Sequence, residues 1–274
     1  MVQMLATGLL LTTAFPLWRA WRANRTTSLR HTLIWAIIAW LAWLYAFCTN
    51  GGAGPERIVA RYLSVCMTGC AIVAVLGARR PGVSAWNVVV LGLLAVALLP
   101  LAQSLMVNGI LQVPVHWTVL MAAILGVGVI NYLPTRLGPA AAMIALAISV
   151  ELIILVTTPD VGERWIRITP VSRCLLALAP WAAYLNVAWQ GAAVSAFDRI
   201  WFDFRDRFGL IWGQRMREQF NRSAANSGWP LHLYWQGLRS LRAADHLSAP
   251  EPSAILATLH ALLKRFGMPA ESGQ

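Results

Sequence analysis

The sequence predicts an all-α integral membrane protein with seven transmembrane helices, an amphipathic interfacial helix after the seventh and a small polar tail. Apolar residues make up 58% of its 274 residues and charged residues only 12%, whereas charged residues make up about a quarter of an average soluble protein. Seven apolar stretches, each close to the length that a helix needs to cross a bilayer, fill residues 1–195. We therefore divide the chain into a transmembrane bundle, residues 1–195, and a cytoplasmic juxtamembrane tail, residues 196–274.

Charges and turn residues separate the seven predicted spans. The spans are residues 4–18, 32–48, 58–77, 85–106, 117–133, 139–158 and 175–193. The first span is short and contains Pro16, so a cleaved signal peptide is its main alternative. However, Arg19 and Arg22 follow this apolar run instead of preceding it, and no small-x-small cleavage site is visible. We therefore interpret this segment as a span.

Arginines in alternate loops predict the orientation. The loops after the first, third and fifth spans contain no acidic residue and carry Arg19, Arg22, Arg25, Arg30, Arg79, Arg80 and Arg136. Since short cytoplasmic loops are enriched in Lys and Arg, we expect the N-terminus outside and the tail inside. Lys264 is the only lysine beside 21 arginines, which is typical of a GC-rich bacterium. The expected location is therefore the bacterial cytoplasmic (inner) membrane.

Glu151 is the charged residue that the sequence singles out within a span. It lies about 4 Å to the outer side of the centre of its span at a rise of 1.5 Å per residue, where a carboxylate costs roughly 2.5–3.5 kcal/mol. The same rise places Arg61 some 10 Å outside the midplane (~1.5 Å per residue). We hypothesise a Glu151–Arg61 ion pair that fixes helix register. A ligand or proton site and a lipid-facing protonated acid are the alternatives.

Four further polar residues complete the set of ligand or proton candidates. Ser64 and Thr68 share a helix face with Arg61, and Tyr184 and Asn186 of the last span lie near the midplane. No two histidines share a span at ligand spacing, so no metal or cofactor is expected.

Two cysteines lie at the outer ends of their spans. Cys48 and Cys174 form a candidate disulfide if their helices are neighbours in an oxidising compartment. Unpaired thiols are the default interpretation.

The tail begins with an aromatic stripe at helical spacing. The stripe consists of Phe197, Trp201, Phe204, Phe208, Ile211 and Trp212 and continues through Met216 and Phe220. Three- and four-residue steps predict an amphipathic helix over residues 197–220, and its position after a span predicts that it lies on the inner leaflet or against a partner. Gly209 and Gly213 allow a bend or a close contact.

The rest of the tail is expected to be short and interrupted. Residues 231–235 alternate in polarity and predict an extended segment that turns at Gly237. The prolines of residues 249–253 predict a linker, and residues 253–266 a last amphipathic helix.

The absence of a catalytic motif in the sequence favours a non-enzymatic role. The first hypothesis is a subunit, scaffold or assembly component of a membrane complex that binds a protein partner through its tail. The second is a carrier of a small solute or proton that uses Glu151, and the third is a lipid-modifying enzyme. Ten basic and seven acidic residues in the tail favour the lipid bilayer over nucleic acid as the electrostatic partner. No sequence feature sets the oligomeric state.

Overall fold

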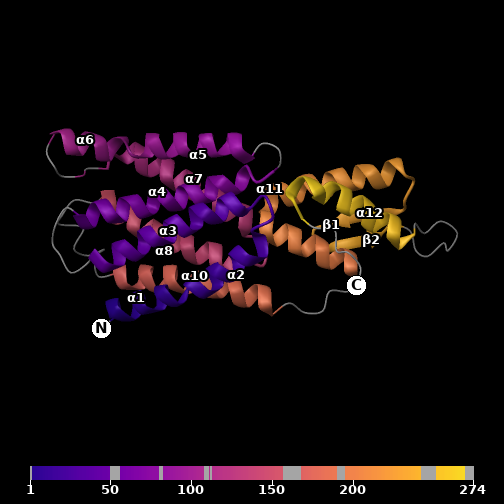
Figure 1. Cartoon of the computed structure of the whole chain (residues 1–274), viewed down its shortest axis with the longest axis horizontal. Coiled ribbons are helices and arrows are strands. Elements are labelled where there is room, and N and C mark those ends of the chain that lie inside the picture. The colour runs from indigo at the N-terminus through magenta and orange to yellow at the C-terminus, as the bar shows by residue number, and fades with distance from the viewer. Residues whose placement is uncertain are drawn as a thin grey trace.

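The computed structural model describes residues 2–49, 56–79, 83–107, 111, 113–156, 168–189, 195–241 and 251–268. Six helical segments in these ranges are long and apolar enough to cross a membrane, so the chain is an all-α, multi-pass membrane protein. Figure 1 shows a long molecule in which the apolar helices lie side by side, while the residues from 196 onward form a separate C-terminal domain at one end. We call the end of the bundle that contacts this domain the domain end.

Five unbroken helices form most of the bundle. They are α3 (Arg30–Cys48), α4 (Glu56–Leu76), α7 (Val115–Tyr132), α8 (Gly138–Val156) and α10 (Thr169–Ala188). α3 packs on α4, α10 packs on α8, and α7 contacts both α4 and α8. More than half of the apolar stretch of α4 is buried, whereas less than a third is buried in each of the other five segments that are long enough to cross a membrane. α4 is therefore the central helix of the bundle.

A helix break divides the first predicted span. The region of this span forms two helices, α1 (Val2–Thr12) and α2 (Ala14–Asn24), which are joined at Thr13. The two helices follow one another along the bundle (Figure 1). Pro16 lies in the first turn of α2, where it cannot donate a hydrogen bond to Thr12. At the break, Trp40 Nε1 of α3 donates to Thr13 Oγ1 at 2.9 Å. Each half is shorter than a spanning helix, so the seventh crossing stays a prediction.

The span predicted at residues 85–106 is also made of two helices. α5 (Val83–Ala97) and α6 (Leu99–Val107) meet at Leu98, just before Pro100, and the apolar stretch Ser84–Met106 is long enough to cross a membrane. These helices lie at the edge of the bundle (Figure 1). Leu91, Leu105 and Met106 are more than half exposed, as expected for side chains that face lipid.

The C-terminal domain begins with a helical hairpin instead of one long helix. α11 (Ala196–Asn226) contains Gly209 in a non-helical conformation, with φ 80° and ψ −169°. In a straight helix, 23 residues would separate Phe197 from Phe220 by about 35 Å, yet their ring centroids lie 5.1 Å apart. The chain therefore reverses at Gly209.

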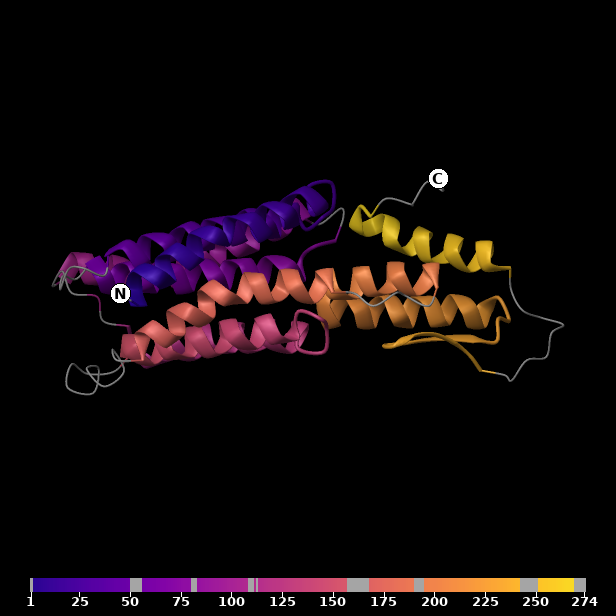
Figure 2. The ribbon, with the colours of Figure 1, turned by 90° about the horizontal axis from the view of Figure 1, so that it is seen from below.

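A strand pair and a last helix cover this hairpin. β1 (Leu231–Tyr234) pairs with β2 (Gly237–Ser240) in antiparallel register, and α12 (Pro252–Leu263) continues into the 3₁₀ helix η2 (Lys264–Phe266). Figure 2 shows the strands and α12 on opposite sides of α11. The strand turn at Gly237 and the last helix are confirmed.

The aromatic stripe forms the core of this domain. Phe197, Trp201, Phe204, Phe208, Trp212, Met216 and Phe220 are at most 7% exposed and pack with Leu233, Leu259, Leu263 and Phe266. Only Ile211 of the predicted interface residues is exposed, at 39%. This corrects the expectation that the stripe lies on the leaflet or against a partner. The stripe is shielded by the domain itself, because the reversal at Gly209 turns both halves of α11 inward.

Candidate functional site

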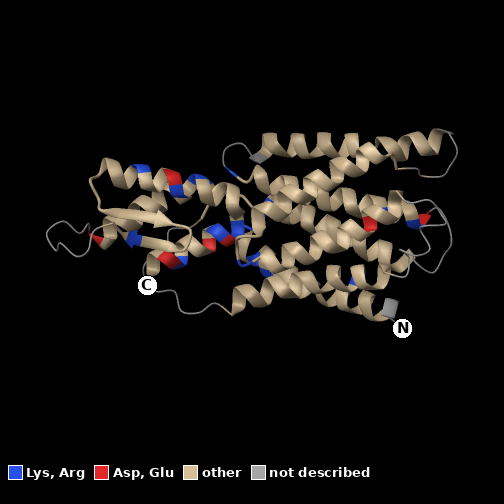
Figure 3. Ribbon diagram, turned by 180° about the vertical axis from the view of Figure 1, so that it is seen from behind, with Lys and Arg blue, Asp and Glu red and all other residues tan. Residues whose placement is uncertain are grey.

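A buried pair of opposite charges lies within the bundle. Arg61 of α4 places Nη1 3.5 Å from Glu151 Oε2 of α8, and the two side chains are 3% and 0% exposed. The hypothesised contact between these residues is thus present. Figure 3 shows that most charged residues lie in the C-terminal domain or at its junction with the bundle, and that few lie along the apolar helices.

The first turn of α10 adds two polar groups to this pair. Ser172 Oγ donates a hydrogen bond to Glu151 Oε1 at 2.8 Å. Arg173 is 3% exposed, and its guanidinium lies over the Phe47 ring at 5.1 Å. Arg173 also interacts electrostatically with both Arg61 and Glu151. We call Arg61, Glu151, Ser172 and Arg173 the buried charge cluster, in which two guanidiniums lie near one carboxylate.

The hydrogen bonds of the cluster are incomplete within the described part of the chain. Arg61 Nε and Nη2 and Glu151 Oε2 are buried without a hydrogen-bond partner there. A buried charged group that lacks hydrogen bonds costs more than it contributes. The cluster is therefore either a register-fixing contact or a place where a proton or a small ion completes the bonding.

The other predicted ligand or proton residues lie elsewhere. Ser64 Oγ donates to the Ala60 carbonyl of its own helix at 2.8 Å, and Thr68 Oγ1 accepts from Trp43 Nε1 at 3.0 Å. Tyr184 packs edge-on against Phe15, at 5.7 Å between ring centroids. Asn186 is exposed. The structure thus brings Arg61 to Glu151 but directs these four side chains to other contacts.

Both cysteines of the candidate disulfide are free thiols in the structure. Cys48 is exposed and Cys174 is partly buried. The default interpretation of unpaired thiols fits this arrangement.

Sequence reasoning missed Ser172 and Arg173, because it began the last span at residue 175. The helix begins at Thr169, six residues earlier, and both side chains lie buried in this additional helical segment. Pro170 supplied a signal for the earlier start, since a proline in the first turn of a helix loses no hydrogen bond there.

A second polar network joins the C-terminal domain to the bundle. Asp206 of α11 receives two hydrogen bonds from Arg205, at 3.0 and 2.9 Å, and a third from the backbone N–H of Arg136 at 3.3 Å. Trp235 Nε1 donates to the Pro134 carbonyl at 2.9 Å. Asp206 is 4% exposed. We call Asp206, Arg205, Arg136, Trp235 and Pro134 the domain joint.

The tip of the α11 hairpin rests directly on the ends of the bundle helices. The Ile211 N–H donates to Asn131 Oδ1 at 3.0 Å, and Tyr132 Oη donates to the Arg207 carbonyl at 3.0 Å. A Cβ added at Gly209 would lie 2.2 Å from Asn131 Nδ2. A glycine is thus required here both by its backbone angles and by the close approach of α7.

No group of three His, Cys, Asp or Glu side chains suited to a metal ion occurs among the residues described here. Comparisons of the chain with protein-family models, with curated proteins and with solved structures found no match. The functional argument therefore depends on the two polar networks and on the surfaces near them.

Proposed function

We propose that this chain is a non-enzymatic component of a bacterial inner-membrane assembly, a scaffold or subunit that presents its C-terminal domain at the cytoplasmic face. The observation that carries this proposal is the domain joint. The Arg136 N–H donates to Asp206 Oδ1, the Arg136 Nε lies 3.6 Å from Asp206 Oδ2, and Trp235 donates to the Pro134 carbonyl, so directional contacts tie the domain to one loop of the bundle and favour a single orientation. A fixed orientation is what a docking subunit needs.

Contacts between loops and domain support the proposed topology. Ser28 of the first loop donates a hydrogen bond to the Phe266 carbonyl, and Ala78 of the third loop packs in the same core as Phe266. Arg136 of the fifth loop forms a salt bridge with Asp206. These three arginine-bearing loops therefore lie at the domain end. Together with the enrichment of arginine in cytoplasmic loops, this arrangement supports seven crossings with the N-terminus outside and the domain inside.

Comparative purification tests the scaffold proposal. The full chain, its Asp206→Asn variant and an Asp203→Asn control are purified in mild detergent, and the co-purifying proteins are compared by quantitative mass spectrometry. Asp203 is 34% exposed and pairs with Arg207, which is 29% exposed, so its loss should cost far less than that of the buried Asp206 carboxylate. A partner depleted by Asp206→Asn alone supports the proposal. Identical protein profiles for all three chains would contradict it.

A proton or small-solute carrier is the second candidate, and the buried charge cluster is the observation that favours it. Glu151 Oε2 and two Arg61 nitrogens lack hydrogen bonds within the described residues, as a site awaiting a proton or ion would. A cavity between α4, α7 and α8 has a volume of only about 10 Å³, which is close to the space that one water molecule needs. Proton flux into liposomes containing the protein, abolished by Glu151→Gln, would establish this function. Equal flux in both preparations would exclude it.

A further inference from the structure

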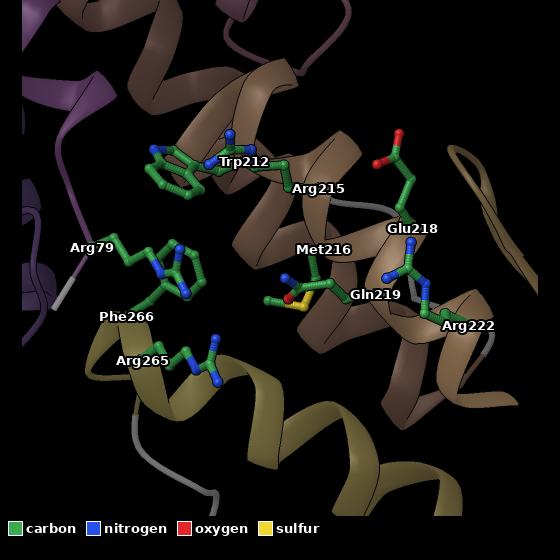
Figure 4. Close-up of a pocket in the computed structure, with 9 residues that line it drawn as sticks. All are labelled: Arg79, Trp212, Arg215, Met216, Glu218, Gln219, Arg222, Arg265 and Phe266. Carbon is green, nitrogen blue, oxygen red and sulfur yellow. The ribbon is translucent and has the colours of Figure 1, made fainter. Parts of the chain in front are cut away.

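A cavity of about 210 Å³ opens between the C-terminal domain and the end of α4. Its walls come from the second half of α11, from η2 and from the residues just after α4. Figure 4 shows Trp212, Met216 and Phe266 forming its inner wall, with the guanidiniums of Arg79, Arg215 and Arg265 arranged around them. We call this cavity the arginine groove. An apolar cavity of about 150 Å³ holds benzene, so the arginine groove has room for a phosphate group with small substituents.

The arginine groove carries an excess of positive charge that the protein does not neutralise. Four arginines line it, Arg222 in addition to the three above, against Glu218 alone. None of the four forms a salt bridge with a described residue. Arg215 instead lies over the Trp212 ring at 5.4 Å. Guanidiniums that line one cavity without an ion-pair partner are suited to a phosphate, which arginine binds in bidentate geometry.

The position of the groove along the bundle matches the headgroup layer of a bilayer. α4 has 21 residues, which span about 31 Å and so cross a hydrocarbon core of about 30 Å. Arg79 comes three residues after the last residue of α4, and the headgroup layer on each side is about 5–8 Å thick. Trp212, at the inner wall, donates to the Val75 carbonyl of α4 at 3.3 Å. The arginine groove therefore begins where lipid phosphates lie.

We propose that the arginine groove binds the phosphate group of an anionic phospholipid from the adjacent leaflet. Arg79, Arg215 and Arg265 contact the phosphate, and Trp212 and Phe266 line the apolar wall beside it. The lipid then fills the junction between bundle and domain. Basic pockets at this level of other membrane proteins bind anionic headgroups for the same reason. The inference depends on the depth of the groove and not on the scaffold role proposed above.

Lipid retention by the full chain tests this site. The protein is purified in an uncharged detergent, mixed with phosphatidylglycerol or phosphatidylcholine, and examined by native mass spectrometry. We expect the wild type to retain phosphatidylglycerol at least tenfold better than phosphatidylcholine. The triple variant Arg79→Gln/Arg215→Gln/Arg265→Gln should lose this preference. These side chains are at least partly exposed, so the variant should fold, and its elution volume and circular dichroism check this.

A second variant separates a specific site from general charge. Arg199→Gln/Arg217→Gln/Arg239→Gln removes the same number of charges, all from the C-terminal domain and outside the groove, and should keep the preference. Thermal stabilisation by inorganic phosphate without any retention of phosphatidylglycerol would overturn the lipid as the occupant and assign the groove to a soluble phosphate. Phosphatidylglycerol retained equally by wild type and groove variant, or lost equally from both variants, would overturn the proposal.

Discussion

At the scale of single residues, the positions that matter most are those whose chemistry conflicts with their surroundings. The sequence identified Glu151 and Arg61, because a charge within an apolar span is visible without a structure. It did not identify Asp206 as buried, because one carboxylate among many charges in a polar tail carries no such signal. Its burial depends on Arg136, which is distant in the sequence.

The Glu151–Arg61 contact predicts a non-additive effect on stability. Glu151→Gln should lower the free energy of unfolding by roughly 3–5 kcal/mol, because it leaves buried guanidiniums without their counter-charge. Adding Arg61→Gln should restore part of this loss. Thermal unfolding of the single and double variants in detergent measures both effects. The absence of any recovery in the double variant would show that Arg173 or Ser172 is the dominant partner of the carboxylate.

Gly209 should tolerate no side chain. Its φ of 80° and ψ of −169° lie in a region that essentially only glycine occupies, at a cost of about 1–3 kcal/mol for other residues, and an added Cβ would also overlap Asn131. Gly209→Ala should therefore lower the unfolding temperature more than Gly228→Ala. Gly228 is a matched control, because it has a φ of 67° but no atom within 4 Å of an added Cβ. Equal shifts would mean that contact with α7 contributes nothing.

At the scale of elements, hydrophobic periodicity predicted helices well and their reversals poorly. Four of the five unbroken bundle helices begin and end within two residues of the predicted spans, since burial in lipid demands a long apolar run. The stripe over residues 197–220 kept its helical spacing across Gly209, so its pattern resembles that of one amphipathic helix. Both halves of a hairpin present the same apolar face to a shared core, and spacing alone does not distinguish the two cases.

Two positions of α11 test where the stripe is buried. Phe208 is 0% exposed and packs against Phe204 and Phe266, with ring centroids 4.8 and 4.9 Å away. Phe208→Ala should cost roughly 3–5 kcal/mol. Ile211, at 39% exposure, should cost less than half as much when replaced by Ala. Both are measured by thermal unfolding and by trypsin cleavage of inside-out vesicles. A larger effect at Ile211 would indicate that the outer face of the hairpin is the one that docks.

At the scale of the whole molecule, composition was sufficient to predict the class of fold but not how the two parts meet. The seven apolar runs indicate a bundle followed by a tail. The domain joint and the contacts of the hairpin tip connect residues 70 or more positions apart in the sequence, such as Asn131 with Ile211 and Arg136 with Asp206. No local pattern encodes such pairings.

The number of crossings is a prediction at this scale. If α1 and α2 together cross the membrane, the two ends of the chain lie on opposite sides. A protease-sensitive tag at the N-terminus should be removed from intact spheroplasts, while a fluorescent-protein fusion after Gln274 should fluoresce in the cytoplasm. A tag cleaved only after membrane disruption would reduce the count to the six long apolar segments. Alkaline-phosphatase activity from a fusion after Gln274 would contradict the orientation.

The shared core of the C-terminal domain has a consequence for how the protein is made. Leu29 and Ala78 of the bundle loops pack into that core, and the Ser28 N–H donates to the Phe266 carbonyl at 3.0 Å. During synthesis, these early residues emerge and enter the membrane long before Phe266 leaves the ribosome. Every nascent or prematurely terminated chain therefore exposes an uncovered apolar surface at its membrane anchor. Quality-control proteases that recognise such surfaces would distinguish chains that carry α12 and Phe266 from chains that stop before them.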